Sequence, residues 1–180
     1  MLLSTAMLSG RTALGRIVST AACVALAAGC ASGPRTVEDP ERGCRYVAPA
    51  GWMVFDGELR SPSSSLVTLR VLDLREADRT FRDGLPDSIL PQLEEWARSY
   101  YVVEGQPQRA EARVGGLPTL ELTYAVRVRA DDSVTKLVYW VVRPGERLFV
   151  LRAVFPPRGA ERDEADVRGM LATWSFLDAA

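Results

Sequence analysis

The pattern that comes nearest to a catalytic motif is the pair Ser133 and Lys136, separated by two residues. This spacing serves nucleophilic catalysis when both side chains lie on one face of a helix, because the lysine can then activate the serine hydroxyl. The surrounding sequence predicts a β-strand instead, and in a strand two residues three positions apart point to opposite faces. We therefore predict that this pair is not catalytic.

Acidic side chains are the main remaining source of acid–base chemistry, because the chain contains no histidine. That absence excludes histidine-based catalytic triads and histidine-ligated zinc sites. No calcium-binding loop and no glycine-rich phosphate loop occurs in the sequence. Each acidic cluster has a structural explanation. Asp131 and Asp132 lie in a predicted turn, and Glu94 and Glu95 lie on an exposed helix face. Asp163, Glu164 and Asp166 lie at a predicted helix start. We predict no catalytic residue, no cofactor and no metal site, and leave open a hydrolase in which folding brings two carboxylates together.

A further reactive group is the thiol of Cys30, at the end of an N-terminal segment with the features of an export signal. Arg11 and Arg16 are the only charged side chains before Arg35, and residues 17–29 carry no charge. This apolar stretch is shorter than the roughly 20 residues that a membrane-spanning helix needs. Basic residues, a short apolar stretch and small residues at its end are typical of a secretory signal peptide.

The run Leu26-Ala27-Ala28-Gly29-Cys30 resembles the lipobox of bacterial lipoproteins. The resemblance implies cleavage between Gly29 and Cys30 and attachment of a diacylglycerol to the Cys30 thiol. Two or more acyl chains, such as palmitate, anchor a protein stably to a membrane. The predicted partner is thus a membrane, and Ala31 after the cysteine favours the outer membrane, facing the periplasm. A plain signal peptide with an incidental cysteine is the alternative.

The chain divides into three parts: the signal peptide over residues 1–29, a lipidated cysteine and flexible tether over 30–43, and one domain over 44–180. The tether prediction rests on residues 31–42, which are polar and contain proline and glycine, so they have little to bury. The whole chain is 47% hydrophobic and 25% charged with a net charge of −1, which is typical of a folded domain without affinity for nucleic acid. After cleavage, Cys44 is the sole free thiol, and we expect it to be buried.

Hydrophobic periodicity predicts an antiparallel sheet with two helices packed on it, an α+β fold. Alternating apolar residues predict strands at 67–71 and 120–129. Residues 137–142 are apolar on both faces, which predicts a central strand with Tyr139 and Trp140 in the core on opposite sides. A return strand is expected at 148–155. Helical spacing predicts amphipathic helices at 87–100, capped by Asp87, and at 163–174.

Three short runs give this domain a resemblance to the PsbP-like superfamily, which includes bacterial lipoproteins of the DcrB type. The runs are Pro49-Ala50-Gly51-Trp52, Gly116-Leu117-Pro118-Thr119-Leu120-Glu121 and Trp174-Ser175-Phe176. The resemblance covers nearly all of residues 44–177 and implies an α/β/α sandwich. It implies no activity, since one fold hosts unrelated functions.

The sequence therefore predicts a non-enzymatic envelope lipoprotein that binds or scaffolds a protein or a small ligand. The polar Ser61–Ser65 loop is a candidate mobile contact region. The alternatives are the acid-dependent hydrolase and a chaperone-like holdase for apolar segments, which would need an exposed apolar groove.

Overall fold

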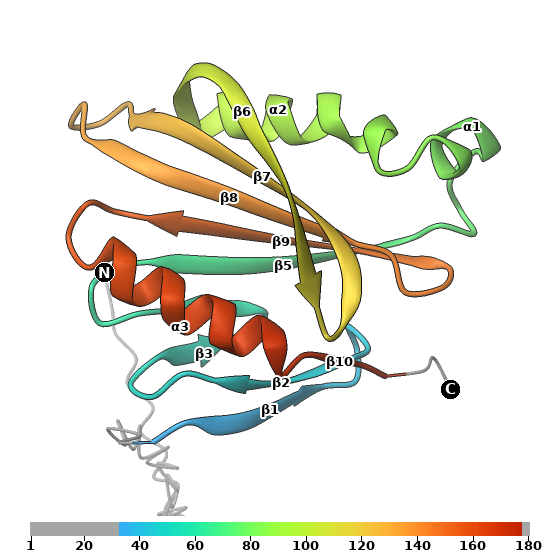
Figure 1. The fold of residues 1–180 in the computed structure, drawn as a ribbon, viewed down its shortest axis with the longest axis horizontal. Coiled ribbons are helices and arrows are strands. Elements are labelled where there is room, and N and C mark those ends of the chain that lie inside the picture. The colour runs from blue at the N-terminus through green and yellow to red at the C-terminus, as the bar shows by residue number, and fades with distance from the viewer. Residues whose placement is uncertain (1–32, 178–180) are drawn as a thin grey trace, which may run out of the picture.

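The computed structural model describes residues 33–177, which fold around a long antiparallel sheet (Figure 1). Its seven strands have the order β3-β4-β5-β9-β8-β7-β6, and a second, three-stranded sheet has the order β1-β2-β10. The strands are β1 (Arg35–Asp39), β2 (Cys44–Ala48), β3 (Met53–Phe55), β4 (Glu58–Arg60), β5 (Leu66–Asp73), β6 (Tyr101–Val114), β7 (Leu117–Val128), β8 (Val134–Val142), β9 (Arg147–Phe155) and β10 (Ser175–Phe176). The helices are α1 (Arg79–Asp83), α2 (Leu90–Tyr100) and α3 (Ala160–Ala172), and a 3-10 turn, η1 (Asp87–Ile89), precedes α2.

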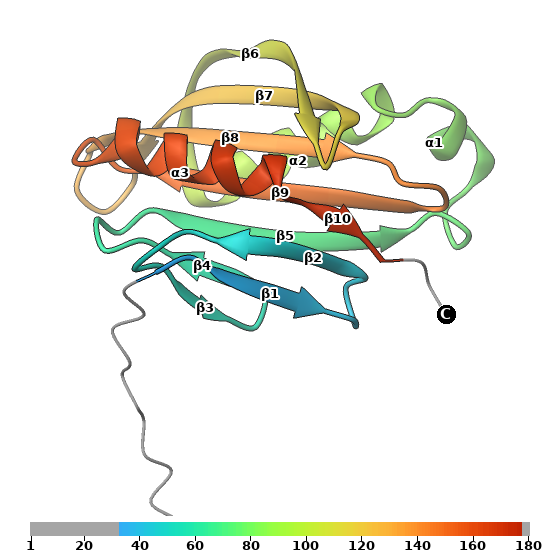
Figure 2. The same cartoon turned by 60° about the horizontal axis from the view of Figure 1, so that its bottom comes forward.

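Each face of the large sheet has its own apolar core. Helix α2 buries Leu93 and Ala97 against one face, and α3 buries Val167 and Leu171 against the other. The small sheet packs on the α3 side, as Figure 2 shows. This layered arrangement confirms the predicted α+β sandwich with a helix on either side of the sheet.

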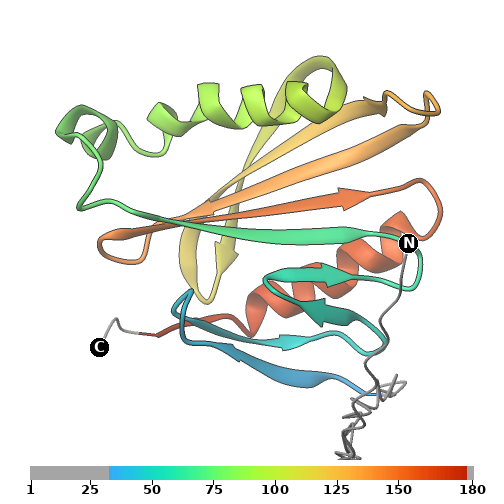
Figure 3. The same cartoon turned by 180° about the vertical axis from the view of Figure 1, so that it is seen from behind.

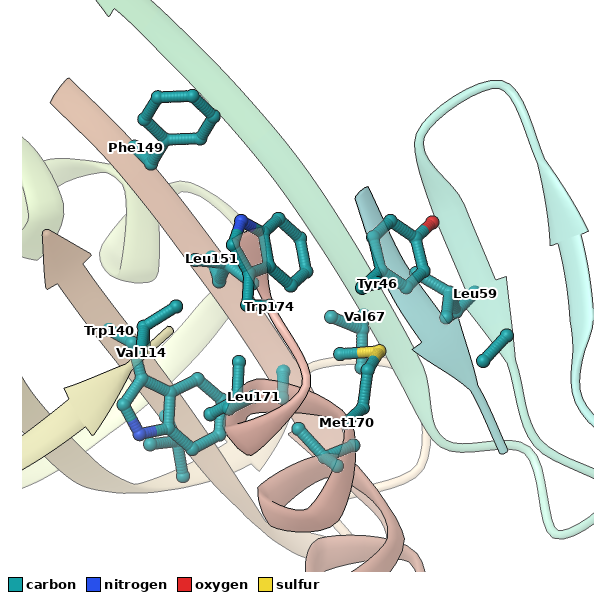
Figure 4. Packing of buried hydrophobic residues seen from close by; sticks show 14 of the residues in the cluster. Tyr46, Leu59, Val67, Val114, Trp140, Phe149, Leu151, Met170, Leu171 and Trp174 are labelled. Atoms are coloured by element: carbon teal, nitrogen blue, oxygen red, sulfur yellow. The ribbon is translucent and has the colours of Figure 1, made fainter. Parts of the chain in front are cut away.

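Strand β8 lies in the interior of the large sheet, between β9 and β7, and is buried on both sides, as its sequence predicts. Trp140 packs in the core under α3, and Tyr139 packs in the core on the α2 face. On the α3 side, Trp174 stacks on Tyr46 with ring centroids 4.6 Å apart (Figure 4). The predicted core positions of Tyr139 and Trp140 are thus confirmed.

The turn between β6 and β7 is held against the end of α3 by a close backbone approach. The Gly115 amide donates a hydrogen bond to the Leu171 carbonyl at 3.0 Å, and the Gly115 φ angle is +56°. A Cβ at this position would lie 2.4 Å from the Trp174 carbonyl oxygen. Only glycine fits here, because any side chain would force the turn away from α3.

The predicted tether is wrong for its second half. Residues Arg35–Asp39 form β1 and pair antiparallel with β2, so that Val37 lies opposite Tyr46. Backbone hydrogen bonds to β2 order this segment although its side chains bury little, and edge strands commonly carry charged residues. Cys44 follows at the start of β2, where it is fully buried and free. Burial, with a smaller contribution from Asp39, raises the pKa of its thiol to about 12, so it acts as a small apolar residue.

Helix α2 begins later than predicted, and Asp87 does not cap it. Asp87 lies in the 3-10 turn and accepts a hydrogen bond from Arg109 at 2.6 Å. The helix starts at Leu90 with Pro91 in its first turn, where a missing amide proton costs nothing. Helix α3, in contrast, begins at Ala160, three residues before its predicted start.

Strand β6 is not predicted by the sequence, although it is the longest strand. The run Glu104-Gly105-Gln106-Pro107 interrupts its alternation, and the pairing with β7 shifts register between Glu104 and Gln108. As an edge strand, β6 exposes most of its residues. A strand with little buried area leaves a weak hydrophobic pattern.

Among residues 33–177, no helix is both long and apolar enough to cross a membrane.

Candidate functional site: the arginine cleft

The predicted lipid-attachment residue, Cys30, and the predicted cleavage site between Gly29 and Cys30 lie outside the described residues. The serine and lysine of the Ser133–Lys136 pair are described, and they have separate partners. The Ser133 hydroxyl donates to Asp131 at 2.7 Å, whereas the Lys136 ammonium donates to Glu164 on α3 at 2.7 Å. The structure therefore does not bring this pair together as a nucleophile and its base.

The Ser61–Ser65 loop is not the mobile contact region that its composition suggests. The hydroxyls of Ser61 and Ser63 each donate to the Asp163 carboxylate at 2.6 Å, and Ser61 and Ser65 are buried. Burial by itself would raise the pKa of Asp163, but the serine hydrogen bonds outweigh it and leave the pKa lowered. This buried cluster, the serine–aspartate cluster, fastens the loop to the first turn of α3.

Folding does bring two carboxylates together, at Glu121 and Glu164, but Arg168 neutralises both. Arg168 binds Glu121 through two hydrogen bonds of 2.9 and 2.7 Å, and it binds Glu164 at 2.9 Å. Trp140 Nε1 donates to Glu121 at 2.8 Å. Burial alone would raise the pKa of either carboxyl, but for each the hydrogen bonds prevail and the pKa is lowered. A general acid needs a raised pKa, so this pair ties α3 to the sheet and does not suit proton transfer.

A different group of residues surrounds a hollow of about 320 Å³ beside the C-terminal half of α2. Helix α2 lies over the β6 and β7 side of the sheet and leaves the same face of β5 less covered (Figure 3). Strand pairing places Thr68, Arg152 and Tyr139 in one row across β5, β9 and β8, with Arg70 and Val150 in the next row. Directly paired residues share a face of the sheet, so these side chains meet under the helix. We call this hollow the arginine cleft.

Two arginines of the cleft are held against aromatic rings of α2. The Arg70 guanidinium lies 4.5 Å from the centre of the Trp96 ring, and that of Arg152 lies 5.5 Å from the centre of the Tyr100 ring. Both distances are typical of cation–π contacts. Of the side chains at residues 33–177, none forms an ion pair or a hydrogen bond with either guanidinium. The cleft therefore presents positive charge that the described part of the chain does not neutralise.

The floor of the cleft holds buried donors without acceptors. Tyr139 is only 1% exposed, and neither its hydroxyl nor the Arg152 Nε atom has a hydrogen-bond partner. Burial raises the pKa of Tyr139, and the nearby Arg152 opposes this only in part, so the hydroxyl keeps its proton. Buried polar groups are almost always hydrogen-bonded in folded proteins. Among residues 33–177, the other two buried side-chain atoms without a partner are Ser65 Oγ and Trp174 Nε1, and neither residue lines the cleft.

Asp56 and Glu58 line the same cleft and are the acidic pair that the hydrolase alternative would use. Asp56 binds Arg42 at 3.1 Å, and Glu58 lies 3.5 Å from Arg60. Each acid thus has an arginine partner of its own and is not held in a shared acid–base pair.

A second hollow, of about 720 Å³, lies near the start of η1 and is lined mainly by apolar side chains. Leu85 and Pro86 form one wall, and Ala112, Leu120 and Leu148 belong to the sheet. The holdase alternative would use this hollow. Each of its polar side chains, Arg113 and Arg143 among them, is exposed or has a hydrogen-bond partner, so it lacks the orphaned buried donors of the arginine cleft.

No protein-family model matches this chain, and no curated protein matches it in sequence. Solved structures do match it. Cyanobacterial PsbP (CyanoP) from Synechocystis sp. PCC 6803 aligns with a TM-score of 0.58 and 10% identity, over 81% of this chain and 93% of its own. The fold is PsbP-like. The Ran-binding protein Mog1p of Saccharomyces cerevisiae aligns at a TM-score of 0.51 and 12% identity, over 82% of this chain and 97% of its own. These identities are low, so the likeness establishes the PsbP-like fold alone and confirms that prediction.

Sequence reasoning did not single out the arginine cleft. Arg70 and Arg152 alternate with apolar residues in β5 and β9, a pattern that normally indicates solvent-facing positions. Tyr139 was correctly predicted to be buried, but a sequence does not show that its hydroxyl lacks an acceptor. Only the pairing register of three strands brings the residues together.

Proposed function

We propose that this protein is a lipid-anchored binding protein of the bacterial cell envelope, and that the arginine cleft is its binding site. The observation that carries the proposal is the pair of buried donors in the cleft, Tyr139 Oη and Arg152 Nε, which have no acceptor. Small-molecule sites are typically hollows in which a few polar groups converge, and the arginine cleft brings Arg70, Arg152 and Tyr139 together beside the rings of Trp96 and Tyr100.

Binding without catalysis fits the cleft better than a reaction does. The described residues include no histidine and no cluster of three potential metal ligands. The fold is compatible with such a role, since one structural neighbour bears the name of a Ran-binding protein. That partner is not carried over, because no residue set in this chain indicates it.

The anchor half of the proposal rests on the lipobox-like run that ends at Cys30. Replacing Cys30 with serine removes the thiol that receives the lipid, so we expect most of the protein to leave the membrane fraction. The measurement is immunoblotting of membrane and soluble fractions of the native host. Cys23→Ser is the matched control, because Cys23 lies in the predicted signal peptide, and its retention should match the wild type. Equal retention of the Cys30→Ser and wild-type proteins would refute the anchor.

The binding half is tested by what the protein carries when it is extracted gently from its own membranes. We expect native mass spectrometry to show a bound small molecule.

A further inference from the structure

We infer that the arginine cleft takes a small molecule in which an oxyanion, a carboxylate or a phosphate, is joined to a compact apolar body. This inference deepens the proposed function and rests on it. Four groups of observations define the ligand: the orphaned donors, the unneutralised charge, the walls and the size of the hollow.

The orphaned donors require an acceptor. Tyr139 Oη and Arg152 Nε are buried in the floor of the cleft without partners, and leaving a buried donor unpaired is unfavourable. Because neutral Tyr139 donates one proton and a guanidinium only donates, the missing group must supply acceptor atoms. An oxyanion offers several acceptor oxygens close together.

The charge of the cleft selects an anion over a neutral acceptor. Arg70 and Arg152 line the same hollow without carboxylate partners, while the acids at its rim are engaged by Arg42 and Arg60. The rings of Trp96 and Tyr100 hold the two guanidinium groups in place. A fixed guanidinium binds carboxylate and phosphate through paired hydrogen bonds, which is the strongest class of such contacts.

The walls and the volume define the rest of the molecule. Val150 supplies an aliphatic contact, and Trp96 and Tyr100 supply aromatic ones. A volume of about 320 Å³ is at the lower end of the range of roughly 300–1,000 Å³ for small-molecule sites. The apolar body must therefore be small, about the size of one ring.

The test uses the full chain purified in detergent and four probes: benzoate, phenyl phosphate, inorganic phosphate and benzyl alcohol. Isothermal titration calorimetry measures the dissociation constant of each probe. We expect benzoate or phenyl phosphate to bind at least tenfold more tightly than benzyl alcohol, which has the ring without the charge. We expect inorganic phosphate to bind more weakly than phenyl phosphate, because it lacks the apolar body.

Variants locate the binding in the cleft. Arg152→Gln should weaken the binding of the best anionic probe about 10- to 100-fold, the loss expected for a charged hydrogen bond. Arg70→Gln should weaken it as well, and because Arg70 is exposed this variant keeps the test valid if Arg152→Gln fails to fold. Tyr139→Phe should weaken it about fivefold, through the loss of one neutral hydrogen bond. Arg158→Gln is the matched control, since Arg158 is exposed and lies outside the cleft, and it should leave binding unchanged.

Three results would overturn the inference: equal binding of benzyl alcohol and benzoate, no binding of any anionic probe, or equal losses in Arg158→Gln and Arg70→Gln. The proposed function fails separately, when the protein extracted from its own membranes carries no molecule in the cleft. A neutral molecule found there would overturn the inference and leave the proposed function standing.

Discussion

Replacing Arg168 by methionine is expected to destabilise the domain by about 2–3 kcal/mol at pH 7. This loss is smaller than the full cost of breaking a buried ion pair, because Arg168 is 45% exposed. Methionine keeps the apolar stem of Arg168 but leaves the Glu121 carboxylate buried with Trp140 as its remaining hydrogen-bond donor. Chemical denaturation followed by tryptophan fluorescence measures the change.

The pH dependence of this loss identifies its cause. In the wild type, Arg168 and Trp140 overcome the effect of burial and keep the pKa of Glu121 lowered, so its stabilising effect is lost as the pH falls below about 4. Without Arg168, burial raises that pKa, so the penalty should be small near pH 4 and should grow as the pH rises to 7. Glu121→Gln in the same background should recover part of the loss. A penalty that is equal at pH 4 and pH 7 would show that the ion pair does not stabilise the fold.

Replacing Asp163 by alanine is expected to cost about 3 kcal/mol, which for a domain of this size lowers the melting temperature by roughly 6–12 °C. The carboxylate is 2% exposed and accepts hydrogen bonds from Ser61 and Ser63, so its removal leaves the buried Ser61 hydroxyl and the half-buried Ser63 hydroxyl without this acceptor. The measurement is thermal unfolding followed by circular dichroism.

Glu161→Ala is the control for Asp163→Ala, because both acids lie in the first turn of α3 and only Asp163 is buried. The control should change stability by less than about 0.5 kcal/mol. Since the folded-state pKa of Asp163 is lowered, its contribution is present above about pH 4 and is lost as the pH falls further. Similar losses of stability in both variants would mean that the negative charge at the start of α3 stabilises the fold and that the serine hydrogen bonds do not.

The sequence predicts the elements whose side chains alternate between the core and the solvent. It also predicts the strands that bury side chains in a core on each face of the sheet. Strand β8 is the clearest example, since Tyr139 and Trp140 have apolar neighbours on both faces of the sheet. Strands β1 and β6 could not be predicted in this way, because backbone pairing at sheet edges orders them while most of their side chains stay exposed. Backbone pairing at a sheet edge requires no hydrophobic periodicity in the sequence.

The candidate site was less predictable than the fold for a related reason. The serine–aspartate cluster joins residues about 100 positions apart, and the arginine cleft joins Arg70, Trp96 and Arg152 across three elements. The sequence alone does not distinguish a buried aspartate from a surface aspartate, or a paired arginine from an unpaired one. The contacts that distinguish them form only on folding.

Native mass spectrometry of the protein released from its own membranes tests the proposed binding function most directly. The comparison is between the wild type and Thr68→Trp, whose larger side chain, in the same row as Arg152, should fill the arginine cleft. The proposal predicts an added mass on the wild type that is absent from Thr68→Trp, although both proteins are folded. No added mass on the wild type, or the same added mass on both proteins, would contradict it.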